Sequence, residues 1–226
     1  MQKWLNALER KLYRFNIPPF MKYIVLGMAG VFVLDLALSM TTAYSTRLSL
    51  ISYLTLDIPM VLRGQVWRLV TWLFIPQQSS MLWVLLSLYF YYMIGTALES
   101  RWGVRRLLIY YAIGAVANIA GAFITHALTG YGFGTNTYLY YSLFIAFAAL
   151  YPDMQFMLFF FLPVKAKWLA ALDLLYFLLA IITGPAWIRA AALASLVNVA
   201  IFFGNDIYQM IRRAYFQYQR RRQFRN

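Results

Sequence analysis

The sequence predicts an all-α polytopic membrane protein, and three observations carry this prediction. Of the 226 residues, 63% are hydrophobic and only 12% are charged, whereas soluble domains are about half apolar and about a quarter charged. Six apolar stretches recur along the chain, close to the roughly 20 residues that cross a bilayer as a helix. Basic residues gather between these stretches. Since backbone groups in lipid must be satisfied within the chain, helices are the expected structure.

The N-terminal residues 1–19 are expected to form an amphipathic helix in the cytoplasmic membrane interface. Trp4, Leu8 and Leu12 recur at helical spacing between basic residues, a pattern typical of helices on anionic lipid. The prolines at 18 and 19 end this helix.

The membrane domain is expected over residues 20–205, as one six-helix bundle without internal repeats. The connection 44–80 is long; within it, residues 58–71 fit the interface and residues 67–75 are apolar again. The apolar segment 154–162, after Pro152, is too short to cross as a helix. Residues 206–226 form a basic tail. The six predicted spans are about 23–43, 81–98, 107–128, 137–151, 168–183 and 187–203.

The distribution of basic residues predicts the orientation of a six-span chain. Five Lys or Arg precede or open the first span, three lie at 101–106, two at 165–167 and six in the tail, which all fall on one side. The four others, at positions 47, 63, 68 and 189, fall on the opposite side. Since basic loops stay inside, both termini are expected in the cytoplasm of a multi-pass cell-membrane protein.

Composition also excludes several kinds of chemistry. The chain has no Cys and one His, so thiolate, disulfide and His-rich metal sites are excluded, and neither a metal nor a cofactor is predicted. The net charge of +13 does not indicate nucleic acid, because the basic residues flank apolar spans. The expected partner is the lipid bilayer.

Several motif residues indicate structural roles. Trp67 and Arg68 are expected either to anchor the chain at the interface or to hold the long first loop in place. Gly95 and Glu99 lie one turn apart, and Glu99 is expected to pair with a nearby arginine. The small residues Gly114, Ala117 and Gly121 share a face of the third span and favour close helix packing, and so do Ala200 and Gly204 in the sixth; Asn118 is expected to bond to a neighbouring helix.

Two carboxyl groups fall within predicted spans. Asp35 lies in the first span and Asp173 in the fifth, where an unpaired carboxylate is costly. Each is interpreted either as a hydrogen-bonded structural group or as part of an ion or proton path.

Hydroxyl groups that would serve as nucleophiles are present, but no spacing enforces a base beside one. The candidates are Thr137, Ser142 and Ser195, and the single candidate base is His126, at the outer end of the third span. Most hydroxyls within membrane helices bond back to their own helix.

Four motifs, taken in order, resemble the rhomboid superfamily over about residues 20–205. They are Gly64-Gln65-Val66-Trp67-Arg68-Leu69-Val70-Thr71; Gly95-x-x-x-Glu99 followed by Trp102-Gly103; Ala146-Phe147-Ala148-Ala149-Leu150-Tyr151-Pro152; and Leu162-Pro163-Val164-Lys165-Ala166-Lys167-Trp168-Leu169. The last is especially similar to bacterial rhomboids. The resemblance implies a six-helix rhomboid-like bundle.

The same resemblance implies that catalytic residues have been replaced. Rhomboid proteases use a Ser in a Gly-x-Ser-Gly motif opening the fourth span, and here Thr137 stands at the Ser position with both glycines lost. The His position falls at Val197 or Asn198. The oxyanion-stabilising His and Asn positions fall at Trp83 and Ser87.

The resemblance therefore implies a pseudoprotease, similar to derlins and inactive rhomboids, that binds transmembrane client proteins and influences their degradation or trafficking. One alternative is a divergent intramembrane serine protease that uses Ser142 or Thr137 with His126. A second is a small ion or solute transporter that uses Asp35 and Asp173. The sequence leaves open whether copies of the chain associate as a homo-oligomer.

Overall fold

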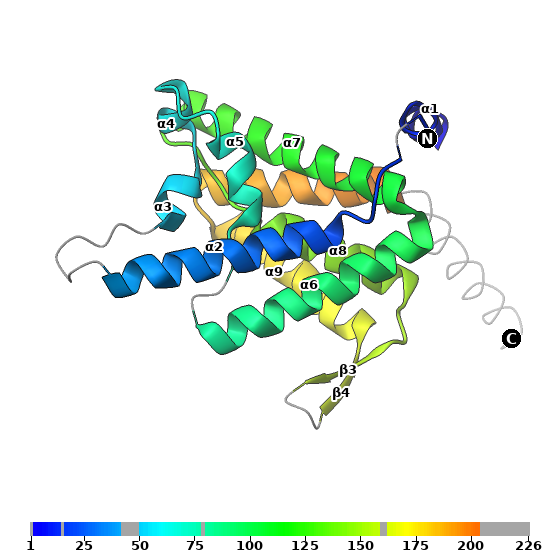
Figure 1. Cartoon of the computed structure of the whole chain (residues 1–226). Coiled ribbons are helices and arrows are strands. Elements are labelled where there is room, and N and C mark those ends of the chain that lie inside the picture. The colour runs from blue at the N-terminus through cyan, green and yellow to red at the C-terminus, as the bar shows by residue number, and fades with distance from the viewer. Residues whose placement is uncertain (1, 15, 42–49, 78–79, 159–161, 204–226) are drawn as a thin grey trace, which may run out of the picture.

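The computed structural model describes residues 2–14, 16–41, 50–77, 80–158 and 162–203 and is mostly helical, as predicted (Figure 1). The predicted tail 206–226 lies outside the described residues. The helices are α1 Gln2–Leu12, α2 Met21–Thr41, α3 Leu50–Leu54, α4 Ile58–Leu62, α5 Arg68–Thr71, the 3-10 helix η1 Trp72–Phe74, α6 Met81–Trp102, α7 Val104–Thr129, α8 Thr137–Leu150, α9 Ala166–Thr183 and a last helix, Ala186–Phe203.

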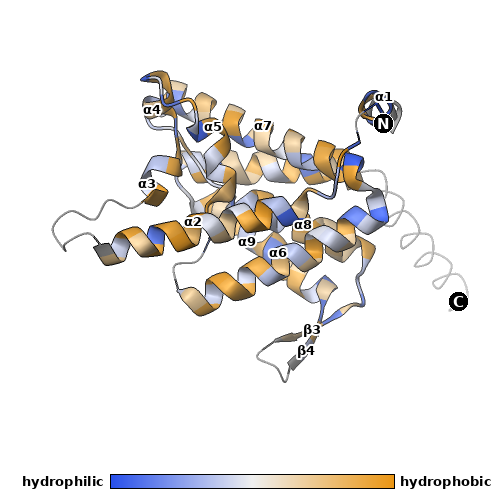
Figure 2. Ribbon diagram, in the orientation of Figure 1, coloured by the Kyte–Doolittle hydropathy of each residue, from blue (hydrophilic) through white to orange (hydrophobic). Residues whose placement is uncertain are grey.

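Among the described residues, five helices are long and apolar enough to cross a membrane: α2, α6, α7, α9 and the last helix. Figure 2 shows hydrophobic residues along α2 and α6, and all five helices have a mean hydropathy of 1.6–2.0. The predicted fourth span is α8, which has 14 residues and is about 21 Å long, against a hydrocarbon core of about 30 Å. The predicted count of six spans is therefore not confirmed, because α8 is a shorter apolar helix.

Helix α8 forms the buried centre of the bundle. It packs against α6, α7 and α9, and nine of its 14 residues are buried, including Tyr138, Tyr140 and Phe147. By contrast, α2, α6 and α9 expose large apolar side chains such as Leu26, Leu82 and Leu172, each more than 60% accessible. Apolar surface of this extent matches a lipid environment.

The long connection between α2 and α6 is folded against the bundle by a short strand pair. Strand β1, Leu56–Asp57, pairs antiparallel with β2, Phe133–Gly134, from the loop before α8. Leu56 is fully buried, and a Cβ at Gly134 would collide with its side chain. The sequence did not predict this pair, because two-residue strands carry no alternating pattern.

The apolar segment after Pro152 does not cross as a helix, as predicted, but it forms a β-hairpin. Strand β3, Gln155–Leu158, pairs antiparallel with β4, Leu162–Lys165, which leads directly into α9. The hairpin projects from the bundle at the end where α8 finishes and α9 begins (Figure 1). The sequence predicted an all-α chain, and this β-hairpin was not expected.

Helix α1 forms as predicted and rests against α7. The Nε of Arg105, near the start of α7, donates to the Leu12 carbonyl oxygen at 3.2 Å, and its guanidinium lies 4.3 Å from the centre of the Tyr13 ring. This contact holds the end of α1 at the same end of the bundle as the α6–α7 turn. The placement of α1 in a membrane interface stays a prediction.

Candidate functional site

Arg68 holds the first loop from inside. Its side chain is buried, and its Nη1 donates to the carbonyl oxygens of Ser52 and Thr55 at 2.7 and 2.8 Å. Its Nε donates to Oε1 of Gln65 at 2.7 Å. A planar guanidinium suits several fixed acceptors at once. Of the two roles considered for Arg68, the contacts support the fastening of the loop.

The two residues around this arginine strengthen the same attachment. The indole of Trp67 donates to the Tyr53 carbonyl oxygen at 3.3 Å, and the Thr71 hydroxyl donates to the Leu54 carbonyl oxygen at 2.9 Å. Carbonyl groups of α3 that lack a partner within that short helix thus accept hydrogen bonds from Trp67 and from side chains of α5. Gly64, just before this motif, has φ +101°, a conformation that strongly favours glycine.

The Gly95–Glu99 motif docks the start of α2 onto α6. Glu99 is buried, and its Oε1 accepts hydrogen bonds from the backbone N–H groups of Phe20 and Met21 at 2.9 and 3.0 Å. One turn earlier, a Cβ at Gly95 would collide with the Met21 side chain. The carboxylate therefore caps the positive end of another helix.

The expected ion pair of Glu99 is wrong. Among the residues that the structure describes, the ion pairs join Asp153 to Lys165 and Lys167, and none includes Glu99. Closeness in the sequence pointed to the arginines at 101, 105 and 106, whereas the donors are backbone groups 79 and 78 positions earlier.

Gly103 and Pro152 lie at turns of the bundle. Gly103 has φ +83° between α6 and α7, so it reverses the chain where a side chain would be strained. Pro152 follows α8, and its carbonyl accepts from the Lys167 N–H at 3.2 Å. Lys165 and Lys167 lie 3.1 and 3.3 Å from the Asp153 carboxylate and hold the pKa of that exposed group below its ordinary value. These bonds close the base of the hairpin.

Thr137, which the rhomboid resemblance sets at the position of the nucleophile, has a hydroxyl as its neighbour. Its Oγ1 lies 2.8 Å from Oγ1 of Thr135, and Thr135 also accepts from the Thr137 backbone N–H. A hydroxyl is no proton acceptor of the strength that activation of a nucleophile requires.

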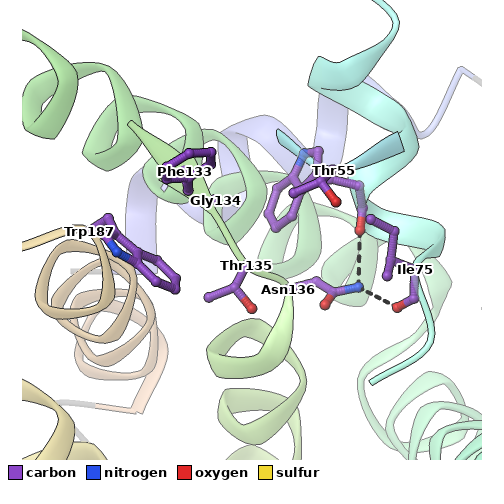
Figure 3. Close-up of a pocket in the computed structure, with 8 residues that line it drawn as sticks. Thr55, Ile75, Phe133, Gly134, Thr135, Asn136 and Trp187 are labelled. Carbon is purple, nitrogen blue, oxygen red and sulfur yellow. Dashed lines mark hydrogen bonds between the residues drawn. The ribbon is translucent and has the colours of Figure 1, made fainter. Parts of the chain in front are cut away.

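Between these two threonines, Asn136 joins α8 to the segment before α6. Its Nδ2 donates to the carbonyl oxygens of Trp72 and Ile75 at 3.0 and 2.8 Å, and its Oδ1 accepts from Gln77 at 2.8 Å. Figure 3 shows the two bonds that the Asn136 amide donates, at a cavity of about 300 Å³. Sequence reasoning missed Asn136, although a buried Asn needs several partners. The cavity is lined by Thr55, Trp72, Ile75, Phe133, Gly134, Thr135, Asn136 and Trp187.

The two residues that the rhomboid resemblance offers for the His position differ in environment. Val197 is 54% exposed, whereas Asn198 is buried and its Nδ2 donates to the Tyr110 carbonyl oxygen at 3.1 Å. Leu139, two residues after Thr137, and Asn198 both pack against Gly114. An apolar side chain and an amide therefore fill the space beside Gly114.

Asn118 bonds to a neighbouring helix, as predicted. Its Nδ2 donates to Oγ of Ser195 on the last helix at 3.3 Å and to the Gly114 carbonyl oxygen at 2.9 Å. Gly121 approaches Ala190 of the last helix, which confirms the predicted close packing on this face of α7. The oxygens Oδ1 of Asn118 and Asn198 are buried and have no partner among the described residues.

Trp83 and Ser87 line a second cavity, and Thr137 does not line it. This lateral cleft, of about 370 Å³, lies between α6, α8 and α9 and also contains Asp173. Thr137 and Asn198 line neither this cleft nor the cavity at Asn136. The four positions that the rhomboid resemblance implies are thus not gathered in either cavity. The cleft is lined by Trp83, Leu86, Ser87, Phe90, Tyr91, Ile94, Tyr140, Tyr141, Phe144, Leu169, Leu172 and Asp173.

The structure does not form the alternative dyad of Ser142 or Thr137 with His126. The Ser142 hydroxyl is fully buried and donates to the Leu139 carbonyl oxygen of its own helix at 2.6 Å. Nδ1 of His126 is buried and bonds to no described residue. Asp35, on α2, is half-buried and does not line the cleft that holds Asp173.

A second network that the sequence did not reveal joins tyrosines of α7 and α8. The hydroxyls of Tyr111 and Tyr140 lie 2.9 Å apart, and Tyr140 donates to the Leu73 carbonyl oxygen at 2.8 Å. Tyr110 donates to the Ser142 carbonyl oxygen at 3.1 Å. Tyrosines within apolar spans signal such bonds, because a buried hydroxyl needs a partner.

Apolar helices of spanning length around a buried centre define an integral membrane protein. Residues 24–204 match the family described as "Eukaryotic integral membrane protein (DUF1751)", and the chain belongs to this family. The match runs from α2 to just beyond the last described helix. No curated protein matches the chain.

Proposed function

We propose that this protein is a rhomboid-like pseudoprotease that binds transmembrane segments of client proteins and influences their degradation or trafficking. The observation that carries the proposal is the environment of two side chains, at the positions that the rhomboid resemblance gives to the catalytic Ser and His. Thr137 is paired with the Thr135 hydroxyl, and the Asn198 amide donates to a backbone carbonyl. Neither arrangement removes a proton from an alcohol.

The chemical consequence is a loss of hydrolysis with retention of the scaffold. A hydroxyl without a base stays protonated, and breaking such a dyad lowers the rate by about 10⁴- to 10⁶-fold. Meanwhile Arg68, Glu99 and Gly95 still make the contacts that hold the first loop and the start of α2 in place. Retention of these structural contacts, without a base beside the hydroxyl, favours binding over hydrolysis as the function.

The lateral cleft supports a client of transmembrane type. It lies between α6 and α9, and the side chains at its lining are mostly apolar or aromatic. Neighbouring residues on both helices expose large apolar surfaces, including Leu82, Leu85, Leu175 and Leu179. Because lipid surrounds this surface, the transmembrane helix of another protein can pack against these side chains more extensively than a soluble protein can.

Crosslinking in native membranes tests client binding. A photoreactive amino acid at Trp83, in the cleft, is expected to capture membrane proteins, whereas the same probe at Val116, exposed on α7, serves as the matched control. Capture restricted to Trp83 supports the proposal. Equal capture at both positions, or no membrane protein from either, contradicts it.

A separate assay tests the absence of catalysis. Purified protein in vesicles is incubated with a model transmembrane substrate and with a fluorophosphonate probe. We expect no cleavage and no labelling. Cleavage that is abolished by Thr137→Val or Ser142→Ala would show a protease and overturn the proposal.

The proposed orientation places both termini in the cytoplasm of a cell-membrane protein. The basic residues before α2, in the α6–α7 turn and in the chain after 206 favour this side. Single cysteines introduced into this cysteine-free chain, at Gln2 and Tyr131, are expected to react with an impermeant reagent from opposite sides of intact cells. Labelling of both from one side would contradict the orientation.

A further inference from the structure

Asp173 lies in the lateral cleft, within a helix of spanning length. It is the eighth residue of α9, which runs over Ala166–Thr183, so it is about 10 Å along the helix from its first residue. A helix of this length matches most of the hydrocarbon thickness of about 30 Å. With α9 across the membrane, a cation that meets Asp173 lies between the ends of the helix and not at either end.

Among the described residues, the Asp173 carboxyl group has no hydrogen-bond or ion-pair partner, unlike Asp153 with its two lysines. The other polar side chains that line the cleft come from Ser87, Tyr91, Tyr140 and Tyr141, and none carries a positive charge. Asp173 is the single charged residue of the lining.

An isolated carboxyl group within a membrane span costs free energy, and the packing of the helices gives no reason for its presence. Acidic residues within spans pair with one another, with a cation or with water, and they mark functional positions. The flanking residues of α9 do not cover it, since Leu172, Tyr176 and Leu179 are all at least 48% exposed. The group is thus open to a partner that approaches through lipid.

We infer that the lateral cleft binds a transmembrane helix that carries a Lys or Arg near mid-membrane, with its cation placed against Asp173. The inference rests on the proposed function and names the class of client. Lys and Arg have long apolar stems that lie along an aromatic wall such as Trp83 and Phe90 while the charged end reaches the carboxylate. The pairing lowers the cost of both charges in the membrane.

Photocrosslinking of designed peptides to the full-length protein in phosphatidylcholine vesicles tests this inference. One peptide is a 22-residue Leu/Ala helix with a central Lys and a photoreactive leucine one turn away, and its control has norleucine in place of Lys. The crosslinked fraction is measured against the peptide-to-lipid ratio. We expect the Lys peptide to reach half-saturation at a ratio about tenfold lower, as for a polar contact between membrane helices.

Variants assign the preference to Asp173. Asp173→Asn should remove the difference between the two peptides, Asp173→Glu should keep it, and Asp35→Asn, in the other intramembrane carboxyl, should leave it unchanged. Elution and thermal unfolding in detergent show that each variant is folded. Should Asp173→Asn fail to fold, Asp173→Lys with a peptide bearing a central Asp tests the same pairing with reversed charges.

The outcomes separate this inference from the proposed function. If both peptides crosslink equally and above the level of an unrelated membrane protein, client binding stands and the role of Asp173 is refuted. If the Lys preference persists in Asp173→Asn, its cause lies elsewhere and the inference fails. If neither peptide crosslinks, the result contradicts the proposed function as well.

Discussion

The bond between Glu99 and the start of α2 is the contact whose removal tests the scaffold most directly. Oε1 of this carboxylate accepts two backbone N–H groups, from Phe20 at 2.9 Å and Met21 at 3.0 Å. Hydrogen bonds to charged groups contribute about 1.5–3 kcal/mol each, and a buried N–H without a partner costs about 1–3 kcal/mol. Because both bonds share one oxygen, Glu99→Ala should destabilise the protein by about 3 kcal/mol. Glu99→Gln keeps an acceptor and should cost about 1 kcal/mol.

Unfolding of the purified protein in mixed micelles, by titration with a denaturing detergent, measures these changes. Ser100→Ala is the matched control, because the neighbouring hydroxyl is exposed and donates to its own helix at the Ala97 carbonyl oxygen. Its effect should stay within about 0.5 kcal/mol. Arg101→Gln tests the rejected ion pair and should be equally mild.

Two results would refute this reasoning. If Glu99→Ala costs no more than Ser100→Ala, the carboxylate does not hold α2. If Arg101→Gln is as destabilising as Glu99→Gln, the charge is paired along α6 after all.

Three further predictions follow from single contacts. Arg68→Lys removes the guanidinium that donates to three acceptors. It should lower the free energy of unfolding by about 2–3 kcal/mol and speed proteolysis within residues 50–77. Arg63→Lys, at an exposed side chain, should change neither the stability nor the proteolysis. Gly95→Ala places a methyl group against Met21 and should lower the free energy of unfolding by about 1–3 kcal/mol. The double variant Gly95→Ala/Met21→Ala should lose less stability than the sum of the two single losses. Strict additivity of these losses in the unfolding titration would contradict the contact. The pKa of Asp153 is lowered in the folded state by its lysines, so its contribution is complete above the ordinary value of 3.8 and is lost as the pH falls through the folded-state value. Hydrogen exchange over residues 152–165 should accordingly quicken on acidification more than intrinsic exchange does, and Asp153→Asn should remove that pH dependence; persistence in the variant would count against the ion pairs.

The sequence by itself determined where the helices lie. Long apolar stretches specify spans because lipid excludes unpaired backbone, and α2, α6, α7, α9 and the last helix begin and end within a few residues of the predicted limits. The shortage of candidate bases was equally plain, since the chain has a single His. The small residues on one face of α7 also predicted close packing, which Gly121 and Ala190 confirm.

The tertiary structure alone decided which partners the polar side chains meet. Glu99 bonds to the start of α2 instead of a nearby arginine, and Asn136 joins α8 to carbonyls about 60 residues earlier. These acceptors and donors are backbone groups, which every residue carries, so no spacing of side chains in the sequence reveals them. The same holds for the cleft that contains Asp173, because its walls come from three helices that become neighbours only when the bundle packs.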